Sequence, residues 1–201
     1  SNAGYYPGAK TMAIKLLFAE DGKILGASIV GPKGVDKRMD VLATAIRANM
    51  TVYDLQELEL AYAPPFSSAK DPVNMAGYTA ANILDGVSSP FYLEDLDNMG
   101  PDALLLDVRT HEEFRGGHLP KAVNIPVDEL RGRIGELPKD KKIHIYCAIG
   151  LRGYVSQRIL EQNGFKTRNL SGGYTLWKAV DRDKKAQAAK ALELSHCGME
   201  I

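Results

Sequence analysis

Apolar side chains recur with a period of two over residues 10–32, most clearly from Met12 to Phe18. This alternation predicts a β-hairpin, and the acidic, glycine-bearing segment 20–23 is typical of its turn. Further along, apolar residues recur at helical spacing, which predicts helices over residues 36–49, from residue 51, and over residues 71–84. A hairpin followed by helices indicates an α+β unit.

Beyond residue 91 the pattern changes to short apolar runs that alternate with helical segments. The small polar residues 87–90 mark the expected boundary between the two parts. Strands are predicted at 103–107, 122–124, 142–147 and 165–169, a turn at 111–115, and helices at 127–136, 154–163 and 174–180. Such alternation predicts an α/β unit with a mostly parallel sheet. The Lys-, Ala- and Glu-rich tail, residues 184–201, is predicted to form a solvated helix.

Composition excludes several classes of partner. The 25 basic and 25 acidic residues cancel, so neither nucleic acid nor an anionic membrane is an expected partner. No apolar run approaches the length that spans a bilayer. Cys147 and Cys197 are too few for a disulfide framework, which favours a reducing, cytoplasmic compartment. Residues 1–3, Ser-Asn-Ala, are typical of a tag remnant and are set aside from the fold.

One stretch combines the features of a reactive thiol. A strand-like run ends at Cys147, a glycine-bearing loop follows, and a helix is predicted after it. Backbone N–H groups and a helix N-terminus would converge there, which favours an anion and makes a thiol more acidic. The alternative is a buried structural cysteine at a strand end.

The spacing from Cys147 to Arg152 separates two kinds of chemistry. Cysteine-dependent phosphatases enclose a phosphate with a C-x5-R loop, whereas four residues separate the cysteine and the arginine here. A shorter loop encloses a smaller group and suits the terminal sulfur of a persulfide better than a phosphoryl group. A phosphatase-like activity therefore remains only as a competing hypothesis.

Residues 91–183 resemble the rhodanese-type sulfurtransferases. The matching segments are the loop itself, Asp107-Val108-Arg109, Glu113-Phe114, Gly117-His118, and Leu170-Ser171-Gly172-Gly173-Tyr174 with Trp177. Within these segments, Glu113 is expected on a solvated face and His118 in a structural role. The resemblance implies that Cys147 carries a persulfide and that Arg152 shapes the loop and holds the anion. It implies that Asp107 and Arg109 support the loop from the preceding strand. The residues that would enclose the persulfide are Ala148, Ile149, Gly150, Leu151 and Gly153. Many members that use thiosulfate have a basic residue where Ala148 stands, so thiosulfate is expected to be a poor donor.

Residues 4–88 resemble the C-terminal dimerisation domain of flavin-dependent disulfide reductases. The matching residues are Lys37 to Leu42, Ala61 to Ser67 and Lys70 to Asn74, and Tyr5-Tyr6-Pro7-Gly8 points to the coenzyme A-disulfide reductase branch. The resemblance implies a homodimer in which Tyr5 and Tyr62 enter the partner subunit's coenzyme A site. The alternative for Tyr62 is packing at the dimer interface.

Some members of that branch carry a rhodanese domain at their C-terminus, which matches the order seen here. The full-length enzyme is then expected to use FAD, NAD(P)H and coenzyme A, with coenzyme A persulfides or disulfides or other small sulfane-sulfur compounds as substrates. No G-x-G-x-x-G fingerprint occurs in the 201 residues. The chain is therefore expected to be a C-terminal fragment, to bind no cofactor itself and to hold no metal. A non-catalytic assembly module is the competing interpretation of the rhodanese part.

Overall fold

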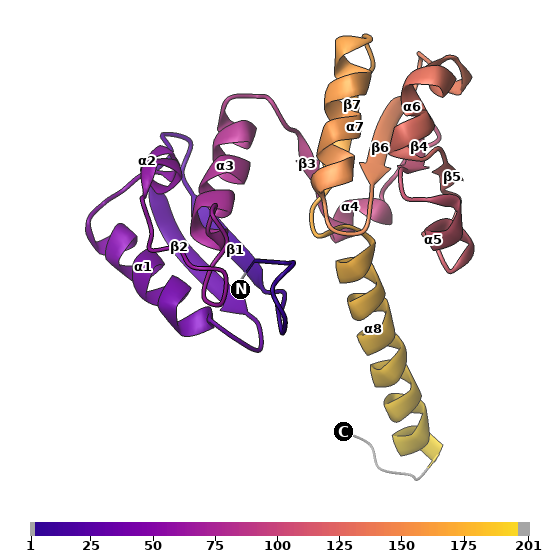
Figure 1. Cartoon of the computed structure of the whole chain (residues 1–201). Coiled ribbons are helices and arrows are strands. Elements are labelled where there is room, and N and C mark those ends of the chain that lie inside the picture. The colour runs from indigo at the N-terminus through magenta and orange to yellow at the C-terminus, as the bar shows by residue number, and fades with distance from the viewer. Residues whose placement is uncertain (1–2, 197–201) are drawn as a thin grey trace. The chain divides into compact units, whose positions relative to one another are not determined.

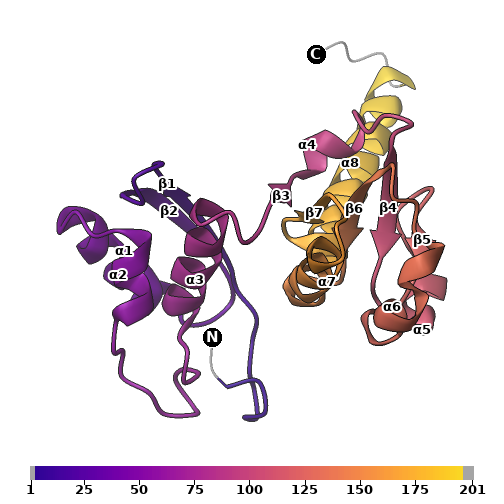
Figure 2. The ribbon, with the colours of Figure 1, turned by 90° about the horizontal axis from the view of Figure 1, so that it is seen from above.

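The computed structural model describes the backbone of residues 3–196 and the side chains of residues 3–190. The chain divides into two compact units, and the boundary lies between Val87 and Ser88. Figures 1 and 2 show the elements of each unit.

The first unit is an antiparallel hairpin with three helices. Its elements are β1 (Ala13–Phe18), β2 (Ile24–Val30), α1 (Val35–Arg47), α2 (Val52–Glu57) and α3 (Pro72–Leu84). The predicted hairpin and all three predicted helices are confirmed. Thr51 and Asp71 begin α2 and α3 with capping boxes, in which each side chain satisfies backbone N–H groups of the first turn. The core lies between hairpin and helices, around Leu42, Leu55 and Val73.

A buried ion pair holds the segment that precedes α3. The guanidinium of Arg38 lies 2.7 Å from an Asp71 oxygen, and both side chains are 2% exposed. Arg38 also donates to the carbonyl oxygen of Phe66, and the hydroxyl of Ser67 donates to Asp71. The pair thus fixes the loop before α3. Its mutual attraction and these additional hydrogen bonds offset the desolvation cost of burying two charges.

The second unit is an α/β layer structure. Its elements are β3 (Pro90–Phe91), α4 (Leu93–Leu96), β4 (Ala103–Asp107), α5 (His111–Arg115), β5 (Val123–Asn124), α6 (Val127–Arg133), the 3-10 helix η1 (Ile134–Glu136), β6 (Lys142–Tyr146), α7 (Leu151–Gln162), β7 (Thr167–Leu170) and α8 (Gly173–His196). The strand order is β3-β7-β6-β4-β5, and every pairing is parallel. The predicted parallel sheet is confirmed, and β6 lies at its centre.

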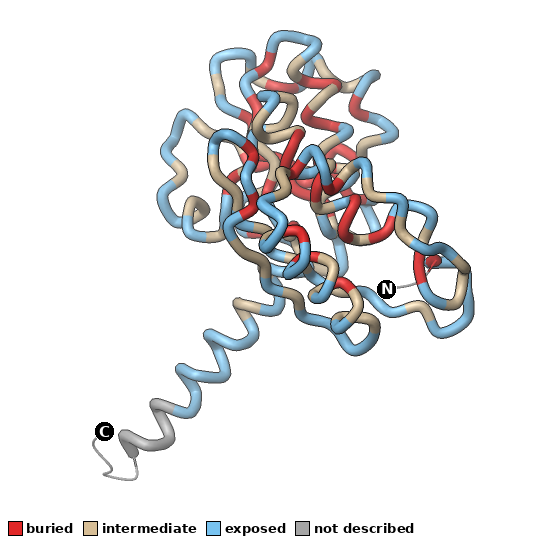
Figure 3. The backbone as a smooth tube through the Cα atoms, turned by 90° about the vertical axis from the view of Figure 1, so that its left-hand side faces the viewer, coloured by how far each residue is buried: buried red, intermediate tan, exposed pale blue. Residues whose placement is uncertain are grey.

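Both faces of the sheet are covered, as a parallel sheet requires. On one face, Ile143 and Ile145 of β6 pack against α6 and α7. On the other face, Tyr146 packs with residues of α4 and α8. Figure 3 colours the buried stretches of the backbone red, whereas residues 182–190 of α8 are exposed.

Several predictions for the second unit differ from the structure, and residues 111–115, expected as a turn, form the short helix α5. Helix α7 begins at Leu151 rather than residue 154, because Tyr154 N–H already donates to the carbonyl of Gly150. Strand β7 begins at residue 167, since the amide of Phe165 closes the end of α7 on Leu160. The tail is not a separate helix but the continuation of α8.

Residues 62–66 also differ from the extended segment that their two prolines predict. The chain instead turns at Pro64 to Phe66, and the amides of Phe66 and Ser67 both donate to the carbonyl of Ala63. Proline disfavours helix in the residue before it, but it is well suited to the first central position of a turn. Among the described residues, no helix is long and apolar enough to cross a membrane.

Candidate functional site

Cys147 lies immediately after β6, at the carboxyl end of the central strand. It is a free cysteine, and only 2% of the residue is exposed to solvent. Ligand sites in open parallel sheets form at this edge, where the loops that leave the strands meet. Because Cys147 is almost fully enclosed, the site favours the transfer of a single small atom to its sulfur over the transfer of a bulky group.

The start of α8 anchors the backbone of the loop. The amides of Tyr174 and Thr175 donate to the carbonyls of Cys147 and Ala148, at 2.9 and 3.0 Å. Gly173 makes this approach possible, because its φ is +56° and a Cβ there would lie 2.6 Å from the Cys147 oxygen. The first two carbonyls of the loop are therefore engaged by α8.

The N–H groups of the loop remain available. Within the described residues, the backbone amides of residues 148–153 donate no hydrogen bond. Three of them open α7, whose first turn leaves its N–H groups without intrahelical partners. Consecutive unpaired N–H groups at a helix start attract an anion. The loop can therefore accept a negatively charged sulfur.

Arg152 makes a two-point ion pair with Glu113, a residue that was expected on a solvated face. Its two terminal nitrogens lie 2.6 and 2.8 Å from the oxygens of Glu113 in α5. The pairing lowers the pKa of Glu113 to about 2. It also raises the pKa of Arg152, to which nearby Cys147 makes a smaller contribution. Arg152 therefore lies close to the thiol, but its charge is balanced.

Asp107 and Arg109 form a second pair at the end of β4, and this pair is buried, whereas the Arg152–Glu113 pair is partly exposed. Asp107 accepts from the backbone and the side chain of Arg109, with a shortest distance of 2.6 Å. Burial opposes the charged guanidinium, but Asp107 outweighs it and the pKa of Arg109 is raised. The guanidinium lies 4.0 Å from the ring centre of Tyr174. Because Tyr174 also bonds to Cys147, this pair supports the loop through α8, consistent with the supporting role expected for both residues.

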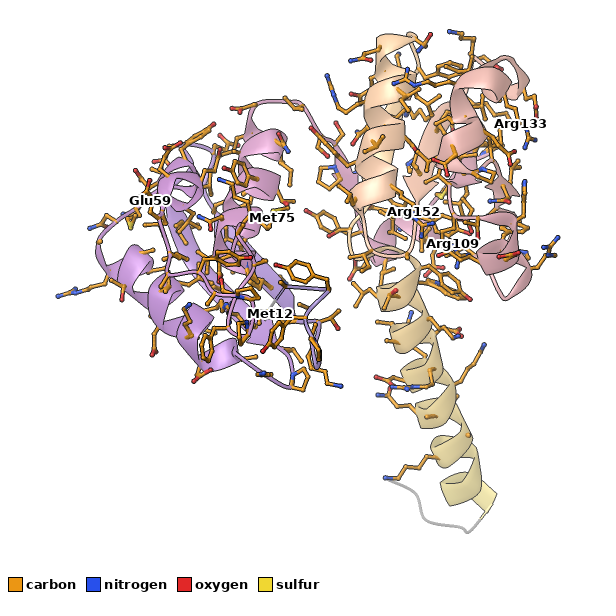
Figure 4. The ribbon with its side chains drawn as sticks, viewed as in Figure 1. Met12, Glu59, Met75, Arg109, Arg133 and Arg152 are labelled. Carbon is orange, nitrogen blue, oxygen red and sulfur yellow. The ribbon has the colours of Figure 1, made fainter. Side chains whose placement is uncertain are left out.

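Figure 4 shows Arg109 and Arg152 at the same end of this unit, near the first turn of α8. The predicted residues 147–153 meet there with the pair from β4. Three further residues also contribute, namely Glu113, Asn169 and Gly173. The capping pattern Thr110-x-x-Glu113 in the sequence indicates that the Glu113 side chain is held at the start of α5. Nothing in the sequence indicates that Glu113 pairs with Arg152.

Asn169 of β7 contacts the middle of the loop. Its Nδ2 donates to the carbonyl of Gly150 at 3.1 Å, and its Oδ1 is buried without a hydrogen-bond partner among the described residues. A Cβ at Gly153 would collide with that oxygen, so glycine is required for α7 to lie this close. Asn169 and Gly153 together set the position of the loop against the sheet.

Apolar side chains surround the charged groups of the loop on the surface. Ile149 is 66% exposed and Leu151 is 73% exposed, and Val155 follows one turn along α7. Exposed aliphatic side chains at a site favour an organic ligand over a small inorganic ion.

In the first unit, Tyr5 and Tyr62 lie together. Their hydroxyls are 3.0 Å apart, and both rings are well exposed. The hydrogen bond with Tyr5 raises the pKa of Tyr62. The amide of Ala3, which falls in the segment set aside as a tag remnant, donates to the carbonyl of Ser67. These contacts bring two residues 57 positions apart into one small polar site.

No metal centre is found in the part of the chain that the structure describes, where no group of three or more potential ligands occurs. His118 stacks on Phe114 with ring centres 3.9 Å apart, and its Nδ1 lies 3.0 Å from the Phe114 carbonyl. The structural role expected for this histidine fits these contacts.

Comparison with known proteins supports both resemblances. Residues 90–180 match the rhodanese-like domain, and residues 1–73 match the pyridine nucleotide-disulphide oxidoreductase dimerisation domain. Coenzyme A disulfide reductases of Staphylococcus epidermidis and Staphylococcus haemolyticus are 48% and 45% identical over 81 and 84 residues, which make up 40% and 41% of this chain and 18% and 19% of theirs.

Two solved structures match both units. Reduced CoADR-RHD of Bacillus anthracis is 51% identical, with a TM-score of 0.88 over 91% of this chain and 33% of its own. An NAD-dependent persulfide reductase from A. fulgidus is 42% identical, with a TM-score of 0.79 over 88% of this chain and 32% of its own. The chain thus spans about a third of these structures and under a fifth of the curated relatives.

Proposed function

We propose that this chain, which joins a disulphide-oxidoreductase dimerisation domain to a rhodanese-like domain, transfers sulfane sulfur through a persulfide on Cys147. The proposal is supported above all by one observation. A free cysteine at the carboxyl end of the central strand is followed by six backbone amides that donate to no described group. Such a loop stabilises a negatively charged terminal sulfur with fixed dipoles, which need no reorganisation when the charge arrives.

Transfer proceeds in two displacements. The Cys147 thiolate attacks the outer sulfur of a donor R–S–SH, a new S–S bond forms, and R–S⁻ leaves with the electron pair of the broken bond. The proton stays on the new persulfide or is lost to solvent, and the loop amides hold the resulting anion. An acceptor thiolate then attacks the outer sulfur, and Cys147 leaves as thiolate. No net oxidation occurs, because the sulfur moves between thiols.

We place this reaction in a larger enzyme that reduces coenzyme A disulfides, persulfides or polysulfides. The names of the relatives support this assignment, since they are coenzyme A disulfide reductases and a persulfide reductase. FAD, NAD(P)H and coenzyme A would act in the full-length enzyme, and the coenzyme A thiol is the acceptor we propose. Tyr5 and Tyr62, held 3.0 Å apart, would donate hydrogen bonds to that thiolate in the partner subunit's site.

Intact-mass measurement tests the sulfur-transfer step. Incubation with an organic persulfide should add 32 mass units, roughly one sulfur atom per chain, through thiol–disulfide-type exchange at an accessible thiolate. Cys147→Ser should abolish the addition, and Cys197→Ser is the matched control that should keep it. A sulfur atom on Cys197, or no addition to the folded wild type, would contradict the proposal. The second outcome would favour an assembly module.

A further inference from the structure

The single charged side chain of the loop is already neutralised. Of residues 147–153, only Arg152 carries a charge, and both of its terminal nitrogens bond to Glu113. Two-point pairing of a guanidinium with a carboxylate fixes geometry as well as charge. A donor that approaches Cys147 therefore meets backbone dipoles and aliphatic side chains, but no unbalanced cation within the loop.

Glu113 is itself held in place by its own helix. Its Oε2 accepts from the backbone amide of Thr110 at 3.0 Å, and the Thr110 hydroxyl accepts from the amide of Glu113. This capping box fixes the side chain at the start of α5, independently of any donor. The second guanidinium nearby, Arg109, is likewise balanced by Asp107. Each of the two guanidinium groups of the site is therefore neutralised by its own carboxylate.

From these contacts we infer that Glu113 is a positioning residue that sets the donor specificity of Cys147: it neutralises Arg152, so that the site selects donors of low charge over dianionic ones. This inference rests on the proposed sulfur transfer and adds to it a residue that decides between donors. Thiosulfate is a dianion, whereas a persulfide carries at most one charge at its reacting end. The exposed Ile149 and Leu151 favour the same organic donors. Poor use of thiosulfate then follows from a balanced arginine as well as from the alanine at position 148.

Two donors of similar size isolate the effect of charge. Thiosulfate carries two negative charges and methanethiosulfonate carries one, and each transfers its outer sulfur to a thiolate. The S–S bond of the donor breaks, and sulfite or methanesulfinate leaves with the electron pair. The measured quantity is the second-order rate constant for sulfur loading of Cys147 in the purified full chain, followed by intact mass.

Glu113→Gln keeps the shape and a hydrogen-bond acceptor but removes the charge. It should raise the thiosulfate-to-methanethiosulfonate rate ratio roughly tenfold at low salt, the effect of one more unbalanced charge about 6 Å from the donor. The gain should shrink at an ionic strength of about 0.5 M, because salt screens the new charge. Glu113→Asp, which keeps the charge, should preserve the wild-type ratio, and Glu112→Gln is the matched control on the same helix.

The double variant Glu113→Gln, Arg152→Gln shows whether the effect acts through the arginine. It should return the ratio to the wild-type value, whereas a purely structural role of Glu113 would slow both donors in parallel. An unchanged ratio in a folded Glu113→Gln protein overturns the inference, and thermal unfolding of each variant verifies the fold. If instead the wild type loads neither donor nor an organic persulfide, the proposed function itself fails.

Discussion

At the scale of single residues, the site depends on which backbone groups of the loop are already hydrogen-bonded. The loop amides near Cys147 are unpaired within the described residues, while the loop carbonyls are engaged by α8 and by Asn169. This division leaves donors, and not acceptors, available to an anionic sulfur. Single substitutions at the supporting residues should therefore alter loading more than stability.

Asn169→Ala should slow persulfide loading about tenfold, because the loop loses the bond that fixes the Gly150 carbonyl. The free energy of unfolding should fall by only about 1 kcal/mol, since Gly150 still accepts from Tyr154. Asn169→Asp should load more slowly still, because a carboxylate opposes the thiolate. The measurements are alkylation and loading rates at fixed pH, with urea unfolding as the stability control. Equal loading in all three proteins would contradict the assigned role.

His144 makes the second unit sensitive to acid. Its side chain is buried in β6 against Phe91, and its Nδ1 has no hydrogen-bond partner among the described residues. Burial first, and Arg168 second, lower its pKa below the ordinary 6.5. The folded unit therefore keeps His144 neutral where the unfolded chain already binds a proton, and stability falls as the pH drops through about 6.5.

Urea unfolding at pH 7.5 and 5.5 measures this dependence. His144→Leu should flatten the pH dependence of the second unit's unfolding free energy relative to wild type, because it removes the proton-binding group. His118→Gln, at an exposed histidine, is the control that should retain the wild-type slope. Identical slopes in the wild type and His144→Leu would show that other groups cause the acid sensitivity.

At the scale of elements, the site is a junction of three segments: the end of β6, the start of α7 and the start of α8. Gly173 allows the junction, because any Cβ there would lie 2.6 to 2.8 Å from two loop carbonyl oxygens. Its positive φ also disfavours other residues. The two helix starts can approach Cys147 together only with glycine at this position.

Gly173→Ala should lower the unfolding free energy by about 1–3 kcal/mol and nearly abolish persulfide loading, since α8 must shift away from the loop. Gly132→Ala is the matched control: a Cβ there meets nothing within 4 Å, and alanine favours helix α6. Thermal unfolding and intact mass measure the two effects. Full loading by a stable Gly173→Ala protein would contradict the junction.

At the scale of the whole molecule, the first unit is expected to form a homodimer, as its match to a dimerisation domain implies. Phe66 is 69% exposed and Met75 is 48% exposed. We expect the segment 62–74, which contains Phe66 and directly precedes Met75, at the dimer interface because it resembles the dimerisation domain. An exposed aromatic and a methionine near a rigid turn are typical of interface contacts.

Phe66→Glu should weaken the dimer at least tenfold, because a charge would replace an apolar contact at the interface. Light scattering across micromolar concentrations measures the change. Val123→Glu, at a residue 46% exposed in the second unit, should leave the dimer intact. A wild type that is monomeric throughout this range would contradict the prediction.

Much of this organisation was predictable because it is local. Period-two and helical spacing predicted the hairpin, the three helices of the first unit and the parallel sheet of the second. The capping pattern at Thr51 and the proline after Asp71 predicted helix starts, since both signals involve only residues close together in the chain. The segment that contains Cys147 was recognisable for the same reason, because strand, cysteine, glycine and arginine follow one another within twelve residues.

Other features were decided only by tertiary structure, because they join residues far apart in the chain. Glu113 seemed to belong to a solvated surface until it was found paired with Arg152, 39 positions away. Tyr5 meets Tyr62 across 57 positions, and Asn169 reaches Gly150 across 19. No local pattern reports such partners, since the strand order of the sheet and the packing of α5 and α8 bring them together. The sequence by itself determined which residue is the nucleophile candidate, and the fold decided which charges surround it.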